Sequence, residues 1–100
     1  MAKKRALVLG PRDNVASVLE EVFSGDEIAV QGGNEIRLLQ AAEDIPFGFK
    51  VAIADIPRGD AVLKYGEAIG RASRDIAKGA LVHIHNIEGS RGRGDLRNDG

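Results

Sequence analysis

The two histidines of the chain, His83 and His85, lie two residues apart in the segment Leu81-Val82-His83-Ile84-His85-Asn86. Side chains alternate across an extended strand, so a strand over Leu81–Asn86 would place both imidazoles on one face. Such a pair can transfer protons near neutral pH or bind a metal ion. The alternative is that both are polar residues on a solvated face. Asn86 either orients a ligand or ends the strand by bonding to the backbone.

The composition excludes several classes of protein. The chain has 100 residues, 43% of them apolar and 29% charged, and a formal net charge of -1. It therefore predicts one small soluble domain without the basic field of a nucleic-acid-binding protein. The absence of cysteine rules out disulfides, thiolate catalysis and cysteine-ligated metals. The apolar run Ala6–Leu9 is too short for a signal peptide, and no run is long enough to span a membrane. We expect a cytoplasmic protein that binds neither nucleic acid nor membrane.

One segment has the periodicity of an amphipathic helix. Val15, Val18, Leu19 and Val22 recur at helical spacing, which predicts a helix over residues 14–23. Asp13 would be its N-cap, and Gly25 falls where a left-handed C-cap is expected.

A short repeat organises the remainder of the chain. The pattern D-I-x-x-G-x-x-V begins at Asp44, Asp55 and Asp75. In two copies proline and glycine take the second and fourth positions of a predicted type I turn, and the aspartates are interpreted as turn formers rather than catalysts. Gly32-Gly33-Asn34 predicts a hairpin. The expected strands are Ala6–Leu9, Glu27–Gln31, Glu35–Ala41, Lys50–Asp55, Ala61–Tyr65 and Leu81–Asn86. The predicted fold is mainly β, with short strands and one short α-helix.

The composition changes near residue 88, so we divide the chain into a domain, residues 1–88, and an Arg/Gly-rich tail, residues 89–100. The tail lacks the apolar content to fold alone. Arg91 and Arg93 can bind a carboxylate through both guanidinium nitrogens or contact a partner chain. The alternative is a flexible tail without a ligand.

Several motifs in order resemble one family. They are Asp13-Asn14-Val15-Ala16, the turn from Ile45 to Ala52, Lys64-Tyr65-Gly66 with Ile69-Gly70, Val82-His83-Ile84-His85-Asn86, and Arg91-Gly92-Arg93-Gly94-Asp95-Leu96. Together they resemble the SAF domain of the altronate and galactarate dehydratase family. The similarity is greatest to the variant made as a separate small subunit, as in altronate dehydratase small subunits and the alpha subunit of sulfolactate sulfo-lyase. It implies a β-clip fold.

The resemblance also implies a reaction. Relatives remove water from sugar acids by taking a proton next to the carboxylate and expelling the β-hydroxyl group, with a divalent metal such as iron associated with activity. By this resemblance His83 and His85 are candidate catalytic residues and candidate metal ligands. The candidate substrate-binding residues are Lys50, Lys64, Tyr65, Asn86, Arg91 and Arg93. Because the chain lacks the larger module of the fused relatives, we expect a separate large catalytic subunit as partner, with a homo-oligomer also possible.

Other interpretations remain open. The substrate can be a sulfo acid instead of a hydroxy acid, as in sulfolactate sulfo-lyase. The chain can also be a non-catalytic binding or assembly module, because SAF-type domains occur in proteins with such roles. A metal enzyme that acts alone is a third alternative, for which the sequence offers no third ligand at a suggestive spacing. Phe49 stands where many relatives have histidine, so a role of that histidine is absent here.

Overall fold

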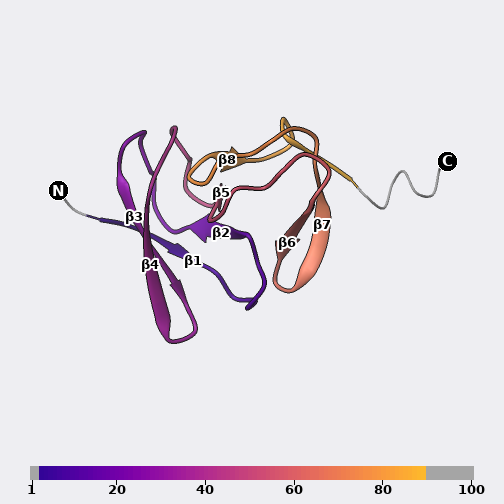
Figure 1. Ribbon diagram of the computed structural model, residues 1–100. Helices are drawn as coiled ribbons and strands as arrows, with labels where there is room; N and C mark the ends of the chain where they lie inside the picture. Colours follow the sequence, from indigo (N-terminus) through magenta and orange to yellow (C-terminus); the bar gives the residue numbers. More distant parts are fainter. Residues whose placement is uncertain (1–2, 90–100) are drawn as a thin grey trace, which may run out of the picture.

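The computed structural model describes residues 3–89, which fold into short strands joined by tight turns (Figure 1). The prediction of a mainly β protein is confirmed. The strands in chain order are β1 (Lys4–Leu7), β2 (Val15–Val18), β3 (Glu27–Gly32), β4 (Glu35–Gln40), β5 (Lys50–Ala52), β6 (Ala61–Lys64), β7 (Glu67–Ala72), β8 (Leu81–Val82) and β9 (Ile87–Glu88). None of the described residues forms a helix long and apolar enough to cross a membrane.

Two sheets make up the fold. The larger has the strand order β4-β3-β1-β2-β5-β8, and the smaller has the order β6-β7-β9. The β3–β4 hairpin and the β6–β7 hairpin lie at opposite sides of the molecule, with β2 and β5 between them (Figure 1). All neighbours in the larger sheet are antiparallel except β1 and β3, which run parallel.

Two apolar cores lie on opposite faces of β2. Ala16 and Val18 belong to one core, and Val15 belongs to the other. Since alternate residues of a strand point to opposite faces, β2 is apolar along almost its whole length. The second core also contains Val62 and Val82, so it joins the smaller sheet to one end of the larger.

The helix predicted over residues 14–23 is therefore wrong, because the structure has β2 at Val15–Val18 and a bridge residue at Val22. The apolar spacing of Val15, Val18 and Val22 arises from burial on both faces of a strand rather than from one face of a helix. The strand is also favoured by the β-branched valines. Asp13 consequently caps no helix.

Four turns of one geometry connect the strands. Each has a glycine of positive φ at its third position, Gly25, Gly48, Gly59 or Gly79, with φ between 87° and 93°. A hydrogen bond of 2.9–3.0 Å from the fourth N–H to the first carbonyl closes each turn. These are type II turns, which require a positive φ only at the third position and therefore favour glycine there. The predicted type I turn is corrected accordingly: Pro46 and Pro57 occupy the first position and glycine the third.

The turns associate in pairs through antiparallel bridges, Val22 with Ile45 and Ile56 with Ile76. The repeat aspartates support these pairs. Asp55 accepts a hydrogen bond from the backbone N–H of Lys78 at 2.9 Å, and Asp75 accepts one from that of Arg58 at 2.9 Å. Asp44 accepts one from Ser24 at 2.8 Å. The interpretation of these aspartates as turn formers is confirmed, although each carboxylate bonds to the paired turn rather than to its own.

Candidate functional site

His83 and His85 lie in a turn instead of a strand. β8 ends at Val82, and residues 83–86 reverse the chain before β9. The Asn86 Oδ1 accepts a hydrogen bond from the His83 backbone N–H at 2.9 Å, and the Asn86 Nδ2 donates one to the Leu81 carbonyl at 2.8 Å. The prediction of an extended Leu81–Asn86 strand with both imidazoles on one face is therefore wrong. A side-chain amide that satisfies nearby backbone groups competes with strand pairing and ends the strand here.

The two histidines have different surroundings. His83 is half-buried, and its ring lies against the Phe49 ring with centroids 4.7 Å apart and an interplanar angle of 50°. His85 is exposed next to Ile84, which is 80% exposed. The His85 carbonyl accepts a hydrogen bond from Arg74 Nη2 at 3.1 Å. Packing fixes the orientation of His83, whereas the His85 side chain faces solvent.

Lys50 lies one strand away from this turn. It pairs in register with Ser17 of β2 on one side and with Val82 of β8, the residue before His83, on the other. Partial burial, and to a lesser degree the positive charge of Lys64, lowers the pKa of Lys50 from its usual value. The ion pairs recorded among residues 3–89 are Lys4–Asp26 and Arg5–Glu20, so Lys50 and Lys64 are not neutralised by a carboxylate there. Two neighbouring uncompensated ammonium groups are suited to bind an anion such as a carboxylate.

Lys64 and Tyr65 lie at the β6–β7 hairpin. The Lys64 Nζ is 4.8 Å from the centroid of the Tyr65 ring, and Tyr65 is 57% exposed. Tyr65 has φ 55°, and among residues 3–89 no other non-glycine residue has a positive φ. A bulky residue rarely adopts this conformation, and such strain is often found at functional sites.

The carboxylate of Asp13 holds this hairpin in place, which the sequence reading missed. The Tyr65 N–H donates to Asp13 Oδ2 at 2.7 Å, the Gly66 N–H donates to Oδ1 at 2.8 Å, and the Gly10 N–H donates to Oδ2 at 3.1 Å. Asp13 is 7% exposed. A Cβ on Gly10 would collide with this carboxylate and lie 2.7 Å from the Gly66 nitrogen. The Gly-Pro-x-Asp-Asn loop is the sequence signal for this contact, but its partner is more than 50 positions away.

The structure thus brings some predicted site residues together and separates others. Lys50 lies beside the start of the His83 turn, and the charge of Lys64 reaches Lys50. Within the part of the chain that the structure describes, no recorded hydrogen bond or ring contact joins His83 to Lys64 or Tyr65. Arg91, Arg93 and the other tail residues from 90 to 100 lie outside the described residues. The side-chain oxygen and nitrogen of Asn86 are both bonded to the backbone, so its described role is to shape the turn.

The donor groups of residues 3–89 do not make a complete metal site. No group of three or more histidine or acidic residues in this range is arranged to hold a metal ion. His83 and His85 would supply at most two ligands, and stable sites usually need three or more.

Comparison with known proteins shows the family. The model of the altronate/galactarate dehydratase SAF domain matches residues 4–90, and the chain belongs to this family. Altronate dehydratase of Bacillus subtilis is 32% identical over 85 residues, which are 85% of this chain and 16% of that protein. Altronate dehydratase of Escherichia coli is 40% identical over 74 residues, 74% of this chain and 14% of that protein.

A second group of relatives is matched over most of its own length. The (2R)-sulfolactate sulfo-lyase subunit alpha of Paracoccus pantotrophus is 45% identical over 62 residues, which are 62% of this chain and 92% of that protein. The corresponding subunit of Chromohalobacter salexigens is 36% identical over 76 residues, 74% of this chain and 81% of that protein. The chain is thus related to dehydratases and lyases, and spans only a small part of the dehydratases but most of the alpha subunits.

Proposed function

We propose that this chain is the small subunit of a sugar-acid dehydratase and eliminates water from a hydroxy acid together with a large catalytic subunit. The observation that carries the proposal is the share of each relative's length that this chain matches. The match is a small part of single-chain altronate dehydratases and most of a sulfo-lyase alpha subunit. A protein named as one subunit works with others. The domain would perform here, as a separate chain, the role that it has within the longer dehydratases.

The proposed chemistry begins with substrate binding. Elimination removes a proton from the carbon next to a carboxylate, and the β-hydroxyl group leaves as water. A cation on the carboxylate stabilises the negative charge that develops in the transition state. Lys50 and Lys64 are assigned this role because each has an ammonium group without a carboxylate partner among residues 3–89. The Tyr65 hydroxyl is assigned a hydrogen bond to the same substrate.

Proton transfer is assigned to the histidine turn. His83 is the preferred acid–base group, because an imidazole can both accept and donate a proton and Phe49 fixes its ring. The exposed His85 is assigned to the side that meets the large subunit. Asn86 is assigned the role of shaping the turn. Arg91 and Arg93 remain proposed ligands of the substrate carboxylate. A divalent metal such as iron is assigned to the assembled enzyme, with most ligands from the large subunit. The cellular location of the enzyme is proposed to be the cytoplasm.

The second candidate function is that of a sulfo-lyase subunit, and a specific observation favours it. The two sulfo-lyase alpha subunits are matched over 92% and 81% of their lengths. The same pair of lysines would then bind a sulfonate or carboxylate. A non-catalytic SAF module is the third candidate, and it predicts that the chain can be removed without loss of turnover.

The test of the proposal is co-expression of this chain with its candidate large subunit and assay against a panel of acids. The panel contains altronate, galactarate, other aldonates and aldarates, and (2R)-sulfolactate. Formation of a dehydrated product from a sugar acid is the expected result. Release of sulfite from sulfolactate alone would replace the first candidate with the second. No turnover of any acid by an assembled complex would contradict both.

A further inference from the structure

β4 is a free sheet edge. It is the terminal strand of the larger sheet, paired only with β3, and within residues 3–89 no strand lies on its other side. It is six residues long and contains no proline. Ile36 and Leu38 on its outer face are 64% and 53% exposed. Proteins usually protect such an edge, because its unpaired backbone groups can pair with another chain.

The hairpin geometry decides which backbone groups are available. The two-residue loop Gly33–Asn34 connects the paired residues Gly32 and Glu35. In such a hairpin the pair next to the loop exchanges hydrogen bonds, and bonded and non-bonded pairs then alternate. Glu35 and Arg37 therefore direct their backbone groups toward β3. Ile36 and Leu38 direct theirs toward the free edge.

A second copy of the chain fits this edge by charge. Two β4 strands related by a two-fold axis pair antiparallel, with the axis at Ile36, Arg37 or Leu38. An axis at Arg37 would place the Arg37 residues of the two copies opposite each other. An axis at Leu38 would place Arg37 opposite the partner's Leu39, which carries no charge. The axis at Ile36 sets Glu35 opposite the partner's Arg37, and the symmetry repeats this contact.

We propose that this chain forms a homodimer in which the two β4 strands pair antiparallel about Ile36, with reciprocal Glu35–Arg37 contacts. In this register the backbone groups of Ile36 pair with those of the partner's Ile36, so the hydrogen-bonding pattern permits the alignment, and the charges select it over the other two. Opposite charges facing each other across strands stabilise pairing, and like charges destabilise it. The outer apolar face, which includes Leu38, becomes continuous across the two copies. This interface lies on the opposite side of the molecule from the β6–β7 hairpin (Figure 1) and is independent of the proposed function.

Charge exchange tests both the dimer and its register. Analytical ultracentrifugation of the chain is expected to give a mass twice that of one copy, in a concentration-dependent equilibrium. Glu35→Arg or Arg37→Glu alone places like charges opposite each other twice, and is expected to weaken dimerisation about tenfold or more. The double variant Glu35→Arg/Arg37→Glu restores the opposite charges and is expected to recover the wild-type dissociation constant.

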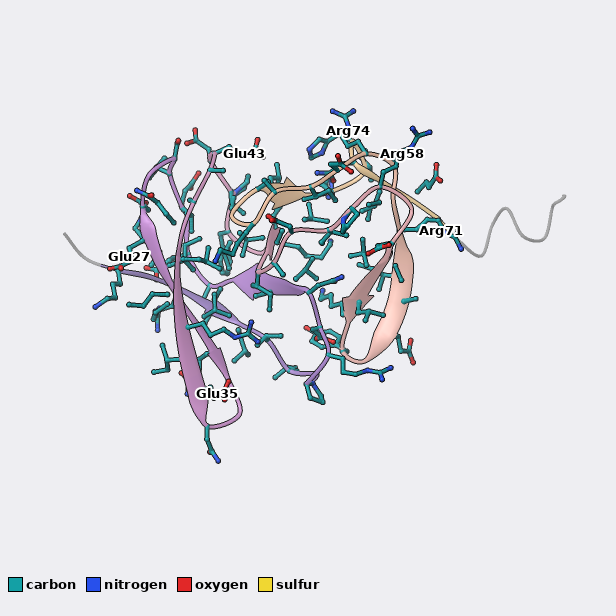
Figure 2. All side chains as sticks on the ribbon, viewed as in Figure 1. Glu27, Glu35, Glu43, Arg58, Arg71 and Arg74 are labelled. Carbon is teal, nitrogen blue, oxygen red and sulfur yellow. The ribbon has the colours of Figure 1, made fainter. Side chains whose placement is uncertain are left out.

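Glu27→Arg is the matched control, because it makes the same change of charge at the other end of the same hairpin (Figure 2). It is expected to leave the dimer intact. A monomer at all concentrations would overturn the proposal, as would a dimer unaffected by either single reversal. Failure of the double variant to recover would overturn this register. The chain could instead be a monomer that binds a different polypeptide and loses that binding in the Glu35→Arg variant. This result would show that the β4 edge binds that polypeptide, and would also overturn the dimer.

Discussion

Lys50 is the residue at which stability and the proposed function are most clearly opposed. Its half-buried ammonium lies near Lys64, and no carboxylate among residues 3–89 neutralises it. Burial of an uncompensated charge costs free energy, which is why the pKa of Lys50 is lowered. A ligand carboxylate would recover this cost by supplying the missing negative charge.

Replacing Lys50 by methionine separates the two effects. Lys50→Met is expected to raise the melting temperature, because a side chain of similar length no longer buries a charge. The gain should be largest at neutral pH and shrink at alkaline pH, since the wild-type lysine then loses its proton in the fold. In the assembled enzyme kcat/KM is expected to fall about tenfold or more, as one charge-assisted contact to the carboxylate is lost. Unchanged kcat/KM would remove Lys50 from the proposed site.

The histidine turn shows what residue-level reading can and cannot predict. The sequence indicated His83, Lys50, Lys64 and Tyr65 as candidates, and the structure places Lys50 and Lys64 near each other. The prediction that both imidazoles lie on one face was wrong, because side chains alternate between the two faces only while the chain stays extended. A single amide, that of Asn86, ends the extension at Val82 through two backbone hydrogen bonds. The sequence is compatible with both roles of Asn86, ligand binding and ending the strand, and does not choose between them.

The β6–β7 hairpin is the element that depends most on a distant residue. Tyr65 and Gly66 both have positive φ, at 55° and 79°, and their N–H groups point to the Asp13 carboxylate. The two consecutive left-handed residues make a type I′ turn, for which asparagine or glycine would be the ordinary choice at position 65. Tyrosine at this place is unfavourable for the turn, and the substrate contact proposed for Tyr65 supplies a reason for it.

Two variants distinguish the scaffold of this hairpin from its proposed function. Asp13→Ala removes the acceptor of three part-buried N–H groups and is expected to reduce the free energy of unfolding by about 3 kcal/mol. Tyr65→Asn keeps those bonds and relieves the unfavourable φ, so stability is expected to stay equal or rise by about 0.5–1 kcal/mol. Thermal unfolding measures both changes. In the assembled enzyme Tyr65→Asn should nevertheless raise KM, and a fully active, stabilised Tyr65→Asn variant would show that Tyr65 does not contact the substrate.

The sequence predicted the elements that are determined by local residue preferences, and missed those that are determined by burial. The D-I-x-x-G-x-x-V repeat indicated three turns, because glycine and aspartate mark them directly. The fourth, with Val22 and Gly25, lacks the Asp-Ile pair that the other three share and was assigned to a helix end. β2 was also assigned to that helix, because burial on both faces removes the alternation that identifies a strand.

At the scale of the whole molecule, the candidate site lies where the two sheets meet. β2 and β5 carry one core on each face, and the smaller sheet covers only their end of the larger sheet. The β3–β4 hairpin extends on the other side, with Glu27 and Glu35, whereas Arg58, Arg71 and Arg74 lie on the side of β7 (Figure 2). The proposed shared site and the proposed dimer interface therefore lie on different sides of the molecule.

The central claim is that this chain supplies catalytic groups to a site shared with a large subunit. Its most direct test is the turnover number of the purified large subunit alone, with equimolar wild-type chain, and with the His83→Ala/His85→Ala double variant. We expect no turnover without this chain, full turnover with the wild-type chain, and a kcat lower by about 100-fold or more with the double variant. Full activity of the large subunit alone, or of the complex with the double variant, would contradict the claim.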